Sequence, residues 1–168
     1  MTNKQKIYAY SAAAVFAFWG IFKMRQRKEA IDLIARTAWG EDYIGGVSGM
    51  QAVMNVIQNR LKSGKYGKTW QDVILKPYQF SIWNAKTVPA YKENATFQRY
   101  LSNIMNVDEK NADFAQAKKL AAAAYDGTLP DLTSGSTHYK LPSATAEWAR
   151  GKYPVAHIGS HDFYNDIE

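Results

Sequence analysis

The segment Ile31–Glu41, with the sequence IDLIARTAWGE, most constrains what this chain can fold into. Its apolar residues recur at the spacing of one helix face, so the segment predicts a helix that buries one side in a core. Gly40 follows the last apolar position and is expected to end that helix. Glu41 would then lie just past a buried helix, beside the bulky side chain of Trp39.

That placement makes Glu41 a candidate catalytic acid. A carboxyl group set against apolar side chains loses hydration, which raises its pKa. General acid catalysis near neutral pH requires such a carboxyl. The alternative is a solvated glutamate in a loop, which is the more common situation for this residue type. The segment alone leaves both interpretations open.

The positive charge of the chain is confined to its N-terminal segment. The 168 residues include 21 Lys and Arg and 15 Asp and Glu, which gives a formal net charge of +6. Six basic residues precede Glu29 and every acidic residue lies from Glu29 onward, so the remainder has no net charge. Nucleic acid is therefore not an expected partner of the folded domain. The absence of Cys excludes disulfides, thiol catalysis and Cys-ligated metal sites.

Residues 7–22, IYAYSAAAVFAFWGIF, form an uncharged and mostly apolar segment between basic flanks. About 16 residues is near the lower limit for a membrane-spanning helix, and the aromatic residues near both ends are typical of membrane interfaces. The alternative is a cleaved signal peptide, but no small-residue cleavage site follows the segment. We expect an N-terminal membrane helix with basic flanks over residues 1–28. The flanking charges nearly balance and only weakly favour a cytoplasmic domain.

The following domain is expected to span residues 29–168, with helices first and a loop-rich region last. No linker rich in Pro, Gly or Ser separates it from the apolar segment, so the two helices are expected to be nearly continuous. Apolar spacing predicts further helices from a cap at Ser48 to Gly64, and over residues 69–75, 96–105 and 112–125. Three short segments near the C-terminus could form a small sheet, at residues 137–139, 155–158 and 162–164. The fold class is therefore mainly α, of the α+β type.

Five segments, in order along the chain, together resemble the SleB-type cell wall hydrolases, a family of bacterial and phage enzymes that cleave peptidoglycan. They are ARTAWGE (35–41), VMNVIQNRLKSGKY (53–66), YQFSIW (78–83), AAAAYDGTLPDLTSGSTHY (121–139) and HIGSHDFY (157–164). The resemblance covers residues 30–165. It implies a lysozyme-like, mainly α domain with a small β- and loop-rich C-terminal wall. It also implies cleavage of the β-1,4 bond between N-acetylmuramic acid and N-acetylglucosamine.

The resemblance further implies that Glu41 is the catalytic acid. Glu41 would protonate the leaving glycosidic oxygen and then accept the proton of the sugar's own C6 hydroxyl, which gives a 1,6-anhydro end without a cofactor or metal. The family often carries a second acidic residue in a WGEARGE-like run, whereas this chain has Gly45 at that position. Asp42 is a weak candidate partner, and a solvated loop residue is the expected alternative.

Two segments are expected to line the substrate groove, and six of their residues are candidates for substrate binding: Gln79, Ser81, Trp83, Thr137, His138 and Tyr139. Amide and hydroxyl groups can bond sugar substituents. Trp83 could stack on a sugar ring or pack in the core. Tyr139 could orient Glu41 or the sugar, or could equally be a core residue. The three His residues lack an HExxH motif or convergent carboxylates, so no metal site is expected.

These observations predict a membrane-anchored lytic transglycosylase that acts on peptidoglycan glycan strands in a bacterial envelope or a phage particle. Its domain would face the periplasm or the cell wall, because peptidoglycan lies outside the inner membrane, and this conflicts with the weak charge-based orientation. The alternative is a non-catalytic peptidoglycan-binding protein or a membrane-bound virion component, which the altered run after Glu41 keeps open. Hydrolysis in place of anhydro-product formation also stays open.

Overall fold

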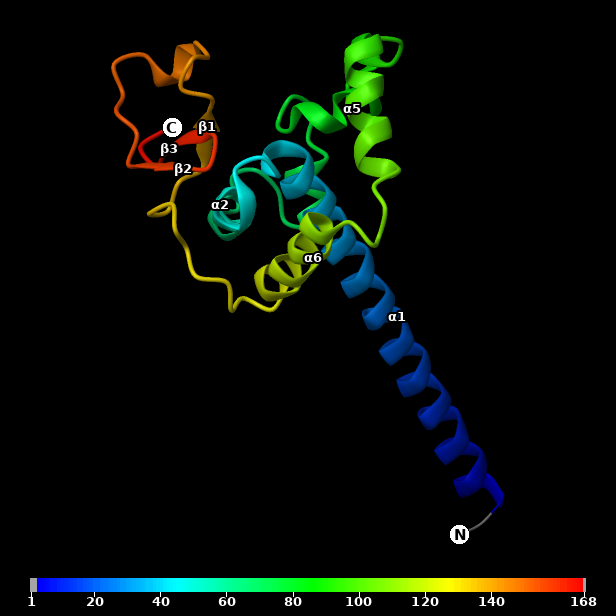
Figure 1. Cartoon of the computed structure of the whole chain (residues 1–168). Helices are drawn as coiled ribbons and strands as arrows, with labels where there is room; N and C mark the ends of the chain where they lie inside the picture. The colour runs from blue at the N-terminus through cyan, green and yellow to red at the C-terminus, as the bar shows by residue number, and fades with distance from the viewer. Residues whose placement is uncertain (1–2, 168) are drawn as a thin grey trace.

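One long helix carries the chain from its N-terminal end into the folded domain. α1 (Asn3–Asp42) has 40 residues; its first part projects away from the other elements and its last part runs among them (Figure 1). The computed structural model describes residues 3–167, with side chains from residue 15 onward. α1 is continuous across residue 28, as the absence of a linker predicted.

The rest of the described chain is mainly helical and ends in a small sheet. The helices after α1 are α2 (Gly46–Ser63), α3 (Trp70–Ile74), α4 (Asn84–Thr87), α5 (Ala95–Met105) and α6 (Ala112–Tyr125). Short 3₁₀ turns form η1 (Ser81–Trp83), η2 (Pro89–Tyr91) and η3 (Glu147–Ala149). The strands are β1 (His138–Lys140), β2 (Ala156–Ile158) and β3 (His161–Tyr164), which pair antiparallel in the order β1-β3-β2.

The core forms where the last part of α1 packs against α2 and α6 (Figure 1). The apolar stripe of α1 is fully buried there at Ile34, Ala35 and Ala38, as its helical spacing predicted. A second, smaller cluster joins Ala52 and Val56 of α2 to Phe163 of β3. Since β3 is the central strand, this cluster fixes the whole sheet against α2 and hence against the end of α1.

Most helix ends follow the predicted chemistry. Thr69 and Asp72 form a capping box at α3, and α6 has the predicted bounds with Asn111 as its cap. Gly64 ends α2 in the left-handed conformation that glycine adopts without steric cost. The predicted cap at Ser48 is wrong, because the cap position is Gly45, three residues earlier, and no side chain caps the helix.

Gly40 does not end α1 as predicted. The helix continues to Asp42, and the amide of Tyr43 still donates to the carbonyl of Trp39 at 3.1 Å. Gly40 serves packing instead: a Cβ added there would overlap Cγ2 of Ile104 and lie 3.0 Å from Cδ1 of Ile82. Glu41 therefore lies in the last turn of α1, and not beyond it.

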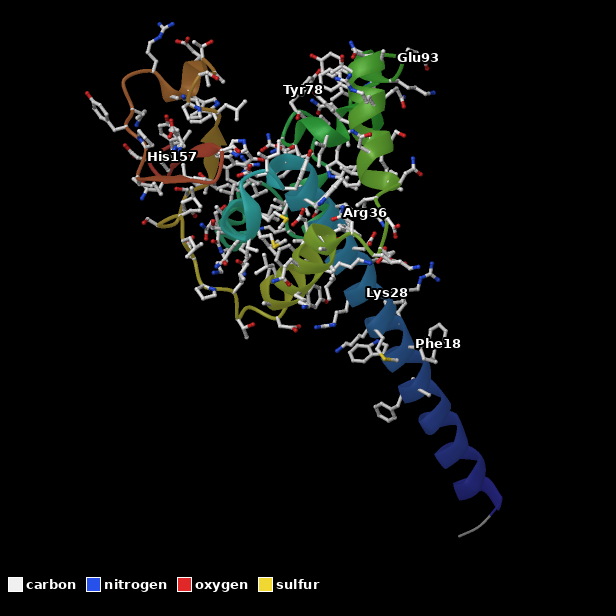
Figure 2. All side chains as sticks on the ribbon, viewed as in Figure 1. Phe18, Lys28, Arg36, Tyr78, Glu93 and His157 are labelled. Carbon is white, nitrogen blue, oxygen red and sulfur yellow. The ribbon has the colours of Figure 1, made fainter. Side chains whose placement is uncertain are left out.

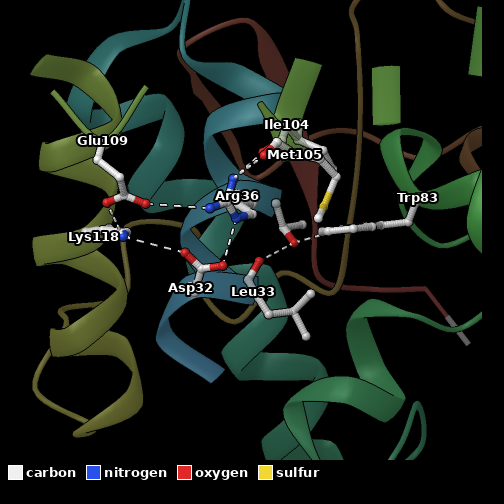
Figure 3. A network of polar contacts seen from close by, with 9 residues as sticks. Asp32, Leu33, Arg36, Trp83, Ile104, Met105, Glu109 and Lys118 are labelled. Atoms are coloured by element: carbon white, nitrogen blue, oxygen red, sulfur yellow. Dashed lines mark hydrogen bonds and ion pairs between the residues drawn. The ribbon is translucent and has the colours of Figure 1, made fainter. Parts of the chain in front are cut away.

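A polar network fixes α1 to the region between α5 and α6 (Figure 3). Arg36 donates to Asp32 at 2.7 Å and to the carbonyl of Ile104 at 2.5 Å, which satisfies an acceptor at the end of α5. Lys118 of α6 pairs with Glu109 and lies 3.5 Å from Asp32. The network holds α5 and α6 in place beside the last turns of α1.

The N-terminal part of α1 leaves large apolar side chains exposed. Phe16, Phe18 and Ile21 each have more than half of their surface accessible, and Figure 2 shows Phe18 away from the folded domain. Among the residues whose side chains are described, no helix is both long and apolar enough to cross a membrane. The expected membrane helix over residues 7–22 is not confirmed, and its residues 7–14 lie outside the described side chains.

Substituting Gly40 by Ala tests the close contact between α1 and the α5 side. We expect Gly40→Ala to lower the free energy of unfolding by roughly 1–3 kcal/mol, because the added methyl group overlaps buried isoleucine side chains. Gly20→Ala is the matched control in the same helix, since no atom lies within 4 Å of the added Cβ, and it should cause no loss. Urea unfolding measures both. Equal losses in the two variants would contradict the packing argument.

Candidate active site

The carboxyl group of Glu41 and the hydroxyl of Tyr139 meet between α1 and β1. The Tyr139 hydroxyl donates a hydrogen bond of 3.0 Å to Oε2 of Glu41. The other carboxyl oxygen, Oε1, is buried and has no hydrogen-bond partner among the described residues. One oxygen is therefore held by the protein, and the other, which is buried, can carry a proton.

Burial raises the pKa of Glu41 above its usual value. The hydrogen bond from Tyr139, the charges of His161 and Arg60, and the amide of Ile82 act in the opposite direction, but burial outweighs them. Burial also raises the pKa of Tyr139, and the nearby charge of Glu41 adds to that effect. The pair is thus set up as a carboxyl that retains its proton to a higher pH and a phenol that stays a hydrogen-bond donor.

Arg60 of α2 lies near this pair and joins α2 to the residue before β1. Its Nε donates to the carbonyl of Thr137 at 2.7 Å, and its guanidinium lies 5.2 Å from the ring centre of Phe80. The residue is almost fully buried, and Nη1 has no partner among the described residues. Arg60 therefore places a positive charge near Glu41 that limits the rise of the carboxyl pKa.

The predicted groove residues between 78 and 83 have different environments. Gln79 is half-buried and Ser81 is exposed, so both side chains can reach a ligand. Trp83 is 2% exposed, and its indole N–H donates to Oγ1 of Thr37 in α1 at 3.0 Å (Figure 3). Of the two alternatives for Trp83, the structure shows packing in the core, so its place among the candidate substrate-binding residues is not supported.

The side chains of the predicted wall at residues 137–139 do not all point to Glu41, because successive side chains of β1 point to opposite faces of the sheet. Tyr139 points to Glu41, whereas the His138 ring packs against Trp148 at 4.9 Å and its Nδ1 lies 3.1 Å from the Thr137 hydroxyl. Burial, with Arg60 nearby, lowers the pKa of His138 to about 4. His138 is therefore neutral at physiological pH, and neither it nor Thr137 contacts the Glu41 carboxyl directly.

The other two histidines, His157 and His161, belong to the β2–β3 hairpin and contact different carboxylates. His157 pairs with Asp162 at 2.8 Å, and Nδ1 of His161 lies 3.3 Å from Asp42. Within residues 3–167, no group of three or more His, Cys, Asp or Glu side chains is placed to hold a metal ion.

Asp42 is buried, and not the solvated loop residue that was predicted. Its carboxylate accepts hydrogen bonds of 3.1 Å from the amides of Gly45 and Ser160. Burial alone would raise the pKa of Asp42, but the contacts with His161 and Ser160 outweigh burial and lower it. A Cβ at Gly45 would overlap this carboxylate, so Asp42 occupies the space that a side chain at position 45 would take.

Comparison with known proteins agrees with this geometry. The family described as Cell Wall Hydrolase matches residues 40–164. The chain belongs to the cell wall hydrolase family. All the candidate site residues lie within the matched range, and the exposed part of α1 lies outside it. This cell wall hydrolase is therefore an enzyme of a family that acts on bacterial cell walls.

Two solved structures share its fold. One is the catalytic domain of the SleB protein from Bacillus cereus, with 26% identity, a TM-score of 0.59, and coverage of 81% of this chain and 89% of that one. The other is the catalytic domain of the germination-specific lytic transglycosylase SleB from Bacillus anthracis, with 25% identity, a TM-score of 0.56, and coverage of 80% and 92%. No curated protein matches this cell wall hydrolase. The predicted SleB-type resemblance is confirmed.

Sequence reasoning missed the buried state of Asp42 and the proximity of the Arg60 charge to Glu41. A signal for Asp42 was present: a glycine three residues later is typical of a turn in which an Asp side chain accepts the backbone amide. No local pattern marks Arg60, because the atoms around it come from the distant residues Thr137 and Phe80.

The raised pKa of Glu41 predicts a specific dependence of stability on pH. A group whose pKa is higher in the folded state stabilises the fold below its unfolded pKa, and this contribution is lost as pH rises toward the folded pKa. We expect stability to fall by about 1.4 kcal/mol for each pH unit in that window. Glu41→Gln should remove the decline, whereas Glu93→Gln, at an exposed carboxyl, should retain it. Denaturant titrations from pH 4 upward measure this, and a decline unchanged by Glu41→Gln would contradict the burial argument.

Proposed function

We propose that this enzyme is a peptidoglycan lytic transglycosylase in which Glu41 is the single acid and base. The observation that carries the proposal is the buried Glu41 carboxyl, with Tyr139 bonded to one oxygen and the other oxygen without a hydrogen-bond partner among the described residues. The similarity to the catalytic domain of a Bacillus lytic transglycosylase supports the same reaction class. The bond cleaved would be the β-1,4 bond between N-acetylmuramic acid and N-acetylglucosamine.

The proposed reaction uses one carboxyl group in two steps. Protonated Glu41 gives its proton to the glycosidic oxygen as the bond to the anomeric carbon breaks. The resulting carboxylate, held by the Tyr139 hydroxyl, takes the proton of the sugar's C6 hydroxyl as that oxygen attacks the anomeric carbon. The product is a 1,6-anhydro end, and Glu41 returns to its protonated form.

The state of Asp42 favours this reaction over hydrolysis. Glycosidases that activate water use a second carboxylate as base or nucleophile. Both oxygens of Asp42 are already occupied, because Oδ1 accepts the amide of Gly45 and Oδ2 accepts the amide of Ser160. Asp42 is therefore poorly placed to activate water, and an internal hydroxyl of the sugar needs no second carboxylate.

An aromatic hollow lies on another face of the last turns of α1. Its volume is about 300 Å³ and it is lined by Trp39, Tyr43 and Tyr100 among others, whereas Glu41 is not among its lining residues. The rings of Trp39 and Tyr43 stack at 5.2 Å, and aromatic faces of this kind bind sugar rings. We place Gln79 and Ser81 on one side of the glycan strand, and Thr137 and His138 on the other.

The proposed place of action is the cell wall side of a bacterial envelope, or a phage particle, with residues 7–22 as a membrane attachment. The exposed apolar side chains of α1 before Lys23 support attachment to an apolar surface. Peptidoglycan lies outside the inner membrane, so the domain after residue 28 would face the periplasm.

Substitution of Glu41 tests the proposed chemistry. Glu41→Gln keeps the shape of the side chain and removes the proton donor, so release of anhydro-muramyl products from purified peptidoglycan should fall roughly 100- to 10,000-fold. Mass spectrometry of the released sugars measures this. Glu93→Gln is the control, because Glu93 is exposed in the turn before α5 (Figure 2) and its substitution should leave the release unchanged.

The product distinguishes the alternatives. Reducing ends in place of anhydro ends would make the enzyme a hydrolytic muramidase. Equal release by the parent and Glu41→Gln would remove Glu41 from the mechanism. Binding to sacculi without release of sugars by the folded parent protein would favour the non-catalytic peptidoglycan-binding alternative.

The proposed location predicts a protease-accessible domain. In intact spheroplasts that express the full chain, added protease should digest the domain after residue 28, because it would lie outside the inner membrane. A cytoplasmic protein of the same cells serves as the control and should stay intact. Complete protection of the domain, with digestion only after lysis, would contradict a periplasmic location.

A further inference from the structure

Asp42 joins three segments that are distant in sequence. It is the last residue of α1, it accepts the amide of Gly45 before α2, and it accepts the amide of Ser160 in the turn between β2 and β3. Its side chain is only 1% exposed. A buried carboxylate is costly unless polar partners surround it. These contacts therefore fix the end of α1 and the β2–β3 hairpin relative to each other.

Three glycines create the space for this carboxylate. A Cβ at Gly45, Gly49 or Gly159 would overlap the carboxylate of Asp42 in each case. Gly45 has an ordinary backbone conformation, with φ −70° and ψ 1°, so the backbone itself does not require glycine there. At Gly45, the absence of a side chain serves the carboxylate of Asp42.

His161 connects Asp42 to the proposed catalytic pair. Its Nδ1 lies 3.3 Å from Oδ2 of Asp42, and its ring meets the ring of Tyr139 edge-on, with centres 4.8 Å apart and planes at 83°. The Tyr139 hydroxyl in turn donates to Glu41. The side chains of Asp42, His161, Tyr139 and Glu41 therefore contact one another in succession. Since Glu41 and Asp42 are adjacent in the chain, the two ends of this series are also joined.

We propose that Asp42 and His161 are positioning residues that hold the Tyr139 hydroxyl on the Glu41 carboxyl. This inference rests on the proposed function of Glu41, because it assigns the support of that acid. Asp42 itself touches neither the substrate nor the reacting atoms. Its role is to fix the hairpin so that the ring of His161 sets the orientation of the Tyr139 ring.

The charge of Asp42 also acts on Tyr139. Four groups face the phenol: Glu41, Asp42 and His161 around it and Arg60 from α2. The two carboxylates favour the neutral phenol and Arg60 favours the phenolate, while burial favours the neutral form most. A fixed negative charge at Asp42 therefore helps to keep the phenol a donor toward Glu41.

The test is the turnover of Asp42→Asn. The amide group of Asn can accept through only one of its two ends, so one of the two backbone amides loses its acceptor. We expect kcat for sugar release to fall roughly tenfold, with little change in KM, because the acid is misplaced while the sugar-binding walls are kept. A higher KM together with an unchanged kcat would overturn the proposal.

Asp162→Asn is the matched control. Asp162 is the next residue after His161 and also pairs with a histidine, His157, but its side chain points to the other face of the hairpin. It should leave kcat unchanged although an Asp–His pair is lost in both variants. Equal losses in kcat for the two variants would show general damage to the hairpin and overturn the specific role of Asp42.

A double substitution separates positioning from general stability. If Asp42 acts through Tyr139, then Asp42→Asn should lower kcat in the parent but have no further effect in Tyr139→Phe. If the fall in kcat of the double variant equals the product of the falls in the two single variants, the proposal is overturned. Gly45→Ala provides a second route, because its methyl group displaces the carboxylate without changing the charge, and it should reproduce the loss in kcat if Asp42→Asn does not fold.

A readout without turnover keeps this test separate from the test of the proposed function. In protein with ¹³C-labelled tyrosine rings, the Tyr139 resonance, assigned with Tyr139→Phe, should shift in Asp42→Asn and stay unchanged in Asp162→Asn. An unchanged resonance in Asp42→Asn would overturn the proposal. Normal turnover by Glu41→Gln would instead refute the proposed function, and a normal kcat for Asp42→Asn beside an inactive Glu41→Gln would refute only the positioning role.

Discussion

The hydrogen bond between Tyr139 and Glu41 joins residues that are 98 positions apart, and the arrangement of the domain serves that contact. Ordering so long a loop costs conformational entropy, which one hydrogen bond cannot offset. Apolar packing contributes to offsetting this cost: the large core packs against Tyr139, and the contact of Phe163 with Ala52 and Val56 fixes the sheet on α2. The core of α1, α2 and α6 then places α2 beside Glu41. The site therefore depends on packing that lies outside it.

The sequence predicted the helical part of the domain well because that part depends on local patterns. Apolar spacing identified the buried stripe of α1, and the bounds of α6 followed from its composition and its following glycine. The prediction failed at Gly40 because a glycine near the end of an apolar stripe has two possible roles. A glycine that ends a helix and a glycine that gives space to a neighbouring side chain look the same in the sequence. Only the contacts of Gly40 with Ile104 and Ile82 in the structure show which role it has.

The site was predicted in part, and the failures have a common physical cause. The five ordered segments identified the family and brought Glu41 and Tyr139 forward as candidates. They could not reveal which aromatic residue contacts Glu41, because Trp83 and Tyr139 differ only in their distant partners: Thr37 holds the indole in the core, whereas Glu41 accepts the phenol hydrogen bond. Asp42 was misjudged because the glycines that surround it come from segments as distant as Gly159.

Glu41 and Asp42 illustrate how two adjacent carboxyl groups acquire opposite properties. Burial dominates at Glu41, and it outweighs the hydrogen bond from Tyr139 and the other contacts that favour the carboxylate, so its pKa rises. At Asp42, contacts with His161 and Ser160 outweigh burial, so its pKa falls. Environments that separate two carboxyl pKa values also separate their roles: the group with the raised pKa can carry a proton to the substrate, and the group with the lowered pKa remains a fixed charge. The end of α1 thereby provides both the proposed acid and the anchor that holds its partner.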